Sequence, residues 1–137
     1  MNDRMYETGT AIDVREFHVM PDMPPPEGKR HAHDYRLDVV ARRDGLDERG
    51  MVIDLDALGG ALGEIAGTID GGDLDKVVAP ETGAQAVTVE VFARWVHDRL
   101  TRLLGPLPGL TLAVRVWESQ VAFGGYVAAL PDPASSE

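Results

Sequence analysis

The sequence of 137 residues contains no cysteine. That absence excludes a disulfide framework, a thiolate metal site and a cysteine nucleophile. Aromatic residues make up only 6% of the chain, so aliphatic side chains must fill the core. No apolar run is long enough to cross a bilayer, and residues 1–8 are polar, so the sequence predicts neither a membrane span nor a signal peptide. We therefore expect a cytoplasmic protein.

Positive charge is also scarce. Thirteen Lys and Arg residues stand against 23 Asp and Glu residues, which gives a formal net charge of −10. Because no basic stripe is present, nucleic acid and anionic membranes are poor candidate partners. The 44% hydrophobic and 26% charged residues are typical of a globular chain, and the length suits a single domain. We expect its core at about residues 9–131, with polar tails such as 131–137.

Four strands follow from the alternation of side chains along the chain. They are expected at residues 11–20, 31–41, 110–118 and 121–130. The strands come as two hairpin-like pairs, with helices between the pairs. This order predicts an α+β fold in which both helices cover one face of the sheet.

Two helices are predicted between the pairs of strands. The first is capped by Asp54 or Asp56, although four glycines weaken it. The second, at residues 88–104, has apolar side chains at three- and four-residue spacing. His97 lies in this helix beside charged neighbours, and we interpret it as part of a solvated face. The proline and glycine in residues 77–86 indicate a loop.

Three of the four histidines are placed to converge at one end of the sheet. His31 and His33 point to the same face of the second strand because strand side chains alternate. His18 lies near the end of the first strand, on the corresponding face. Three neutral imidazoles with an open fourth position are typical of a catalytic zinc site. Exposed strand-end histidines without a metal are the alternative that this spacing leaves open.

Six short motifs occur in a characteristic order along the chain. They are HVMP at 18–21, EGKRHAHDY at 27–35, GMVIDL at 50–55, IDGGDLD at 69–75, TVEV at 88–91 and WES at 117–119. In this order they resemble the 6-pyruvoyl tetrahydropterin synthase and 6-carboxytetrahydropterin synthase family over about residues 11–130. The resemblance implies a T-fold, a four-stranded antiparallel sheet with two helices packed on one face. It also implies a homo-oligomer, a trimer or a hexamer, with sites at subunit interfaces.

The resemblance implies roles for individual residues by position. The three histidines correspond to the family's zinc ligands, so Zn²⁺ is the expected cofactor. Glu118 corresponds to the glutamate that anchors a pterin ring by accepting hydrogen bonds from its N–H and amino edge. Thr88 and Glu90 correspond to neighbouring pocket positions. Independently of the family, a carboxylate at the end of an apolar strand face needs a partner or must reach solvent at the sheet edge.

The departures from the family concern proton transfer. Synthases of the family use a cysteine ahead of the paired histidines, helped by an Asp and His pair, whereas here Gly71 follows Asp70. Glu27 lies four residues before His31, which resembles the branch in which glutamate replaces the cysteine. The candidate bases are therefore Glu27, Asp70 and Glu16, the last of which shares a strand face with the first zinc histidine.

These patterns favour a zinc-dependent lyase or cyclase that acts on a small-molecule substrate, a pterin or a related heterocycle, by a reaction other than the cysteine-dependent one. One alternative is a repurposed enzyme of specialised metabolism that joins or cyclises an amine and a carbonyl compound. Another is a non-catalytic ligand-binding or scaffold oligomer. A collapsed pocket around Glu118 would favour the scaffold, and an open zinc site beside it would favour catalysis.

Overall fold

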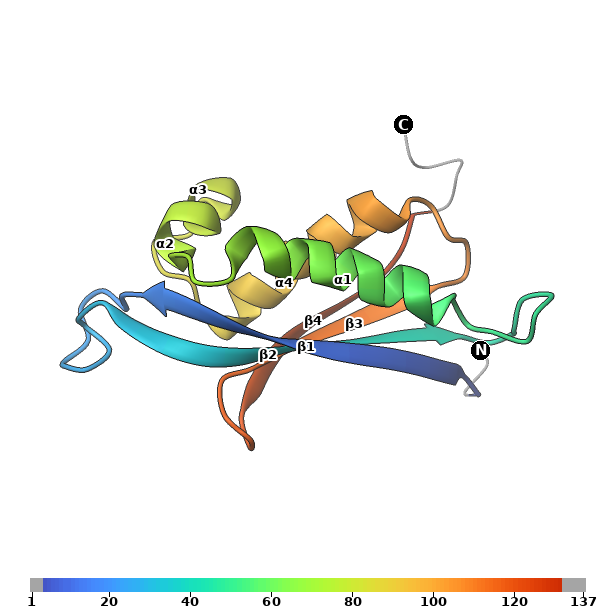
Figure 1. The fold of residues 1–137 in the computed structure, drawn as a ribbon, viewed down its shortest axis with the longest axis horizontal. Coiled ribbons are helices and arrows are strands. Elements are labelled where there is room, and N and C mark those ends of the chain that lie inside the picture. Colours follow the sequence, from blue (N-terminus) through green and yellow to red (C-terminus); the bar gives the residue numbers. More distant parts are fainter. Residues whose placement is uncertain (1–3, 132–137) are drawn as a thin grey trace.

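A computed structural model describes residues 4–131, and Figure 1 shows helices lying over one face of a four-stranded sheet. The elements in chain order are β1 (Tyr6–His18), β2 (His31–Arg43), α1 (Leu55–Ile69), α2 (Leu74–Val77), α3 (Ala79–Thr82), α4 (Val89–Leu104), β3 (Thr111–Trp117) and β4 (Phe123–Ala129). The spatial strand order β1-β2-β3-β4 follows the chain, and all neighbours are antiparallel. The predicted α+β architecture is confirmed.

The register of β2 leaves one end of the sheet narrower than the other. β2 pairs with β1 along its whole length, but its pairing with β3 ends where Arg36 stands opposite Trp117. The first residues of β2, from His31 on, therefore have a strand neighbour on one side only. Glu118, the next residue after β3, comes to lie beside this free stretch.

The core lies between the inner face of the sheet and the two long helices. On α4, Phe92, Val96 and Leu100 are fully buried, in agreement with the predicted periodicity. α1 begins as predicted from an aspartate cap, since Oδ1 of Asp54 accepts hydrogen bonds from the backbone N–H groups of the first helical turn. Burial of a large aliphatic or aromatic side chain contributes about 1.5 to 3 kcal/mol, so this layer holds both helices on the sheet.

Some expectations differ from the structure. β1 begins at Tyr6 instead of residue 11. Residues 77–86, predicted as a loop, contain all of α3. This helix has a proline in its first turn and is capped by Gly83 with φ 70°, so both residues mark the ends of a helix. The predicted tail at 131–137 falls outside the described residues except for Pro131. Within residues 4–131, no helix is long and apolar enough to cross a membrane.

The solvated position predicted for His97 is wrong. The side chain is only 3% exposed because this side of α4 packs on β4. Its Nε2 lies 3.2 Å from the backbone oxygen of Ala128, and its ring lies edge-on to Tyr126. His97 is therefore a structural histidine, remote from the other three.

Candidate active site

The other three histidines meet at the free end of β2. His18 and His31 are directly paired across β1 and β2, and His33 is on the same face two residues further along. The ring centroids are 4.5 Å apart for His18 and His31, 5.4 Å for His18 and His33, and 4.8 Å for His31 and His33. One ligand nitrogen from each ring lies within 4.8 Å of the others. The predicted convergence is confirmed.

The hydrogen bonds of the rings leave nitrogen atoms available for a metal ion. Nδ1 of His31 lies 2.6 Å from the carbonyl oxygen of Lys29, so Nδ1 carries the proton and Nε2 keeps its lone pair. That Nε2 is buried and has no hydrogen-bond partner, and neither has Nδ1 of His18. Unpaired buried nitrogens in a three-histidine cluster fit a divalent metal such as zinc.

The surroundings of His18 favour its metal-binding form. Burial, followed by the neighbouring His31 and His33, lowers the pKa of His18, while Asp75 and the backbone of Val87 act in the opposite direction. A lowered pKa favours the neutral imidazole, which is the form that binds metals.

Tyr35 joins the histidines from the next position on the same face of β2. Its hydroxyl lies 3.2 Å from Nε2 of His18. Burial raises the pKa of Tyr35 above its ordinary value, with further contributions from Glu118, Glu16 and Asp75, so the phenol stays protonated. Tyr35 was not among the residues predicted for the site, although the spacing H-x-H-x-Y places it on the histidine face.

A cavity of about 510 Å³ opens over the three histidines, and we call it the histidine cavity. The residues that line it are His18, Met20, Met23, Glu27, His31, His33, Tyr35, Val87, Thr88, Val89, Glu90, Glu118 and Ser119. The three histidines and the four predicted residues Glu27, Thr88, Glu90 and Glu118 thus share one cavity. The two methionines and two valines among the lining residues give it apolar walls.

Two backbone features position the carboxylates of Glu27 and Glu90. The loop between β1 and β2 is closed at its base, since the Met20 N–H donates to the Glu27 carbonyl oxygen at 2.8 Å. Thr88 caps α4 through its Oγ1, which places Glu90 in the first helical turn. On the facing strand, a Cβ added to Gly124 would stand 3.1 Å from Cδ of Glu90. The missing side chain on β4 therefore lets the start of α4 approach the sheet.

Glu16 lies behind the histidine cavity instead of lining it. It stands opposite His33 in the β1 and β2 ladder, is fully buried, and neither of its carboxyl oxygens has a hydrogen-bond partner. Burial, followed by Asp70 and Asp73, raises its pKa to about 8. A Cβ on Gly72 would stand 3.9 Å from Oε1 of Glu16, so the glycine turn packs against this carboxyl.

Asp70 has a structural contact of its own. Its Oδ1 accepts the backbone N–H of Arg15 at 2.9 Å, where the end of α1 meets β1. The side chain does not line the histidine cavity. Of the three candidate bases, only Glu27 therefore stands on the cavity wall.

The comparisons with known proteins agree with the fold. A family model described as 6-pyruvoyl tetrahydropterin synthase matches residues 12–128. A Caenorhabditis elegans 6-pyruvoyl tetrahydropterin synthase structure has 20% identity and a TM-score of 0.71, with 92% of this chain and 97% of that chain covered. No curated protein matches the sequence.

Two further solved structures share the fold at low identity. Plasmodium vivax 6-pyruvoyltetrahydropterin synthase, solved as a variant in which a catalytic glutamate is replaced by alanine, has 13% identity and a TM-score of 0.73. That match covers 93% of this chain and 99% of the other. An uncharacterized protein from Wolinella succinogenes has 15% identity and a TM-score of 0.65, with 94% and 100% coverage.

Proposed function

Because this chain belongs to the 6-pyruvoyl tetrahydropterin synthase family, we propose that it is a zinc-dependent enzyme that acts on a pterin or a related small heterocycle. The observation that carries the proposal is the position of three converging histidines in the same open cavity as Glu118. The open cavity also supports catalysis over a scaffold role. Without a cysteine in the chain, the reaction cannot use the thiol that typical family synthases use.

His18, His31 and His33 would hold the metal. When bound, zinc supplies Lewis acidity to a carbonyl or hydroxyl oxygen of the substrate. The Lys29 carbonyl fixes the tautomer of His31, and the Tyr35 hydroxyl lies against His18, so both orient their rings toward the site.

Glu118 is the proposed anchor of the substrate. A carboxylate can accept two parallel hydrogen bonds from a ring N–H and an adjacent amino group, as the family resemblance implies. Thr88 and Glu90 also line the cavity and would lie beside the ring of the substrate. The apolar side chains of Met20 and Met23 would exclude water from its faces.

Glu27 is the proposed base, because it is the one candidate on the cavity wall. The hydrogen bond from Met20 holds its backbone at the base of the loop, and the side chain would take a proton from the substrate. The Plasmodium vivax relative also has a glutamate as catalytic residue. Glu16 and Asp70 are the alternatives if Glu27 proves dispensable.

The proposal is tested by separating binding from turnover. We expect Glu118→Ala to abolish binding of a pterin ligand while zinc content is unchanged. Glu27→Gln should retain binding and lower turnover by about 100-fold or more, because a general base contributes at least that much. Glu48→Gln, in an exposed turn outside the cavity, is the matched control. Normal ligand binding by Glu118→Ala would contradict the proposed role of Glu118 as the substrate anchor. Normal turnover by Glu27→Gln would contradict the proposed role of Glu27 and make Glu16 the next candidate base.

We also propose a homo-oligomer, a trimer or a hexamer. β1 and β4 are the edge strands of the sheet, and Phe123 and Val127 on β4 are 49% and 58% exposed. Open edges with apolar side chains are typical of surfaces that pair with another copy. Light scattering at micromolar concentration measures the assembly, and a monomer would contradict this expectation.

A further inference from the structure

The outer edge of β1 is covered at its last residues by the chain that connects α1 to α2, which we call the 70–75 segment. The N–H of Phe17 donates to the Gly72 carbonyl oxygen at 2.9 Å. The N–H of Gly71 donates to the Arg15 carbonyl oxygen at 2.7 Å. In Figure 1 this segment accordingly lies at the arrowhead end of β1. The end of β1 is therefore paired on two sides, with β2 on one and with the 70–75 segment on the other.

One carboxylate of the 70–75 segment holds the residue that follows the first histidine. Oδ2 of Asp75 accepts the backbone N–H of Val19 at 2.9 Å, in a partly buried place. The pairing of β1 with β2 ends one residue earlier, where His18 stands opposite His31. The hydrogen bond to Asp75 therefore fixes the backbone directly beyond His18, where the strand ladder has stopped.

Asp75 can fix its donor because its own backbone is held in place. It lies in the first turn of α2, and Oδ1 of Asp73 caps this helix by accepting the N–H of Asp75 at 3.0 Å. Leu74 and Val78, at the two ends of the short helix, are fully buried in the core. A side chain on a rigid element positions its partner more precisely than one on a free loop.

The cap of α2 also reaches the strand that carries the other two histidines. Oδ2 of Asp73 lies 3.2 Å from Nε of Arg30, the residue immediately before β2 and His31. The guanidinium of Arg30 also lies over the ring of Phe17, 4.1 Å from the centroid. The side chain of Arg30 is 58% exposed, so this ion pair is weaker than a buried one. The ends of both strands are thus connected to α2.

The two carboxylates have no place in the proposed reaction, since neither lines the histidine cavity. All of their contacts are made within one chain, so they do not depend on how other subunits complete the cavity. We propose that Asp75 is a positioning residue of the metal centre, which holds His18 in place through its hydrogen bond to Val19. Asp73 supports it by capping α2 and by pairing with Arg30. This inference rests on the proposed function and adds to it a residue behind the cavity.

Metal affinity measures the role of Asp75. Zinc binding is followed by competition with a chromophoric chelator. Asp75→Ala should weaken zinc binding by about tenfold or more, because groups that orient metal ligands typically contribute that much. Asp75→Asn keeps an oxygen that can accept the N–H of Val19, so it should restore most of the affinity. Equal affinity in Asp75→Ala and the parent protein would overturn the inference.

The asparagine variant also separates the hydrogen bond from the charge. Asp75 lies close enough to His18 to act on its pKa, so its negative charge alone could favour a bound cation. If Asp75→Asn bound zinc as weakly as Asp75→Ala, the charge would be the cause and the inference would fall. The visible spectrum of cobalt-substituted protein reports the coordination geometry. It should be the same in the parent and Asp75→Asn and altered in cobalt-saturated Asp75→Ala.

Asp47→Ala is the matched control for lost stability. Asp47 is likewise a half-buried carboxylate that accepts backbone N–H groups, those of Arg49 and Met51, but it lies in the turn after the other end of β2. Its loss should lower the free energy of unfolding and leave zinc affinity unchanged. A loss of zinc affinity as large as in Asp75→Ala would contradict the positioning role, since destabilisation would then explain both variants.

Nuclear magnetic resonance on metal-free protein separates this inference from the proposed function. The rings of His18 and His31, with centroids 4.5 Å apart, should show a nuclear Overhauser contact, and the Val19 amide should exchange slowly with solvent. Asp75→Ala should weaken the contact and speed the exchange at least about tenfold, and Asp75→Asn should restore both.

The outcomes differ for the two proposals. If the parent protein takes up no metal but shows this pattern, the proposed function falls and the role of Asp75 in holding the histidines together stands. If the parent binds zinc but the ring contact and the Val19 exchange are the same in all three proteins, the inference falls and the metal enzyme remains.

Discussion

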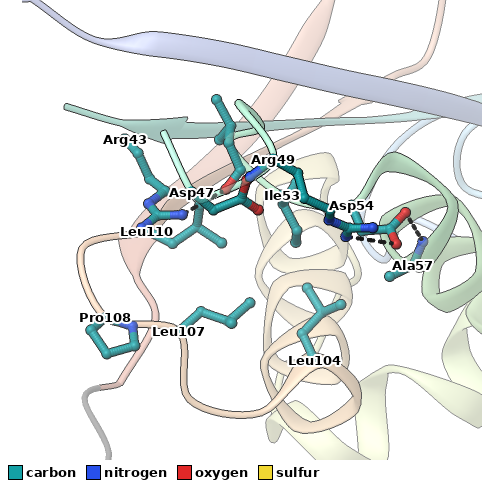
Figure 2. A pocket seen from close by; sticks show the side chains of 11 residues that line it. Arg43, Asp47, Arg49, Ile53, Asp54, Ala57, Leu104, Leu107, Pro108 and Leu110 are labelled. Atoms are coloured by element: carbon teal, nitrogen blue, oxygen red, sulfur yellow. Dashed lines mark hydrogen bonds and ion pairs between the residues drawn. The ribbon is translucent and has the colours of Figure 1, made fainter. Parts of the chain in front are cut away.

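The histidine cavity and a second cavity at the far end of the sheet differ in how their polar groups are paired. The second cavity, of about 310 Å³, lies by the end of β2 and the start of α1, and Figure 2 shows its side chains. There Arg43 Nη1 donates to the Val52 carbonyl oxygen at 3.1 Å, and Arg49 Nη2 lies 3.5 Å from Oδ2 of Asp54. Asp47 accepts two backbone N–H groups of its own turn.

At the histidine cavity, by contrast, several buried polar groups have no hydrogen-bond partner. Buried nitrogens of His18 and His31 have no hydrogen-bond partner, and neither have the two carboxyl oxygens of Glu16 behind the cavity. A buried polar group without a partner costs about 1 to 3 kcal/mol. A cavity alone therefore does not indicate function. The polar groups of the far cavity stabilise the fold, whereas the unpaired groups of the histidine cavity point to a ligand.

The largest difference between the two cavities should appear in metal binding. We expect about one zinc per chain in protein purified without added zinc, and almost none in His31→Ala or His33→Ala, because each removes one of three ligands. Elemental analysis by mass spectrometry measures the content. His97→Asn is the matched control and should keep its zinc, although it loses the contact with Ala128. Equal zinc in all four proteins would show that the cluster binds no metal.

A smaller effect concerns the pH dependence of stability in metal-free protein. The pKa of Glu16 rises from 4.5 in the unfolded chain to about 8 in the folded protein, so the folded state binds its proton more tightly. Its contribution is present below pH 4.5 and is lost as the pH rises toward 8. Glu16→Gln, which cannot ionise, should therefore increase the free energy of unfolding at pH 8 by on the order of 4 kcal/mol.

Urea unfolding at pH 4.5 and pH 8 measures this difference between Glu16→Gln and the parent protein. Near pH 4.5 the two proteins should differ little, because the glutamate is protonated in the folded state. As a control, Glu48→Gln should change the free energy of unfolding by the same small amount at both pH values. A stability difference for Glu16→Gln that is the same at both pH values would show that folding does not raise the pKa of Glu16.

The smallest effect is expected at the far cavity. Arg49→Ala should lower the free energy of unfolding by less than about 1 kcal/mol, because its ion pair with Asp54 is largely exposed. Zinc content and ligand binding should stay unchanged. Chemical unfolding and elemental analysis check both expectations, and a loss of zinc in this variant would mean that the two ends of the sheet are coupled.

The histidine cluster could be predicted because strand geometry alone determines it. Alternation puts His31 and His33 on one face, and a hairpin brings His18 beside them. The cap of α1 followed from the same kind of local rule, with Asp54 now identified over Asp56. Local periodicity and capping therefore sufficed for the α+β class and for the convergence of the three histidines.

Features that depend on contacts distant in sequence could not be predicted in the same way. The first residues of β1 are mostly exposed and show no apolar alternation, and pairing with β2 alone extends the strand to Tyr6. His97 has charged neighbours in sequence, yet β4 covers it. The burial of Glu16 depends on the turn at Gly72 closing over it, which no motif near Glu16 indicates.

The closed base of the loop between β1 and β2 has a consequence for how the family can vary. The hydrogen bond from Met20 to Glu27 ties the ends of the loop together, and its exposed tip, at residues 21–26, lies outside that tie. Insertions or deletions in the tip would therefore leave the glutamate where it is. Evolution can thus remodel the rim of the cavity, and with it the size of ligand admitted, without displacing Glu27 from the cavity wall.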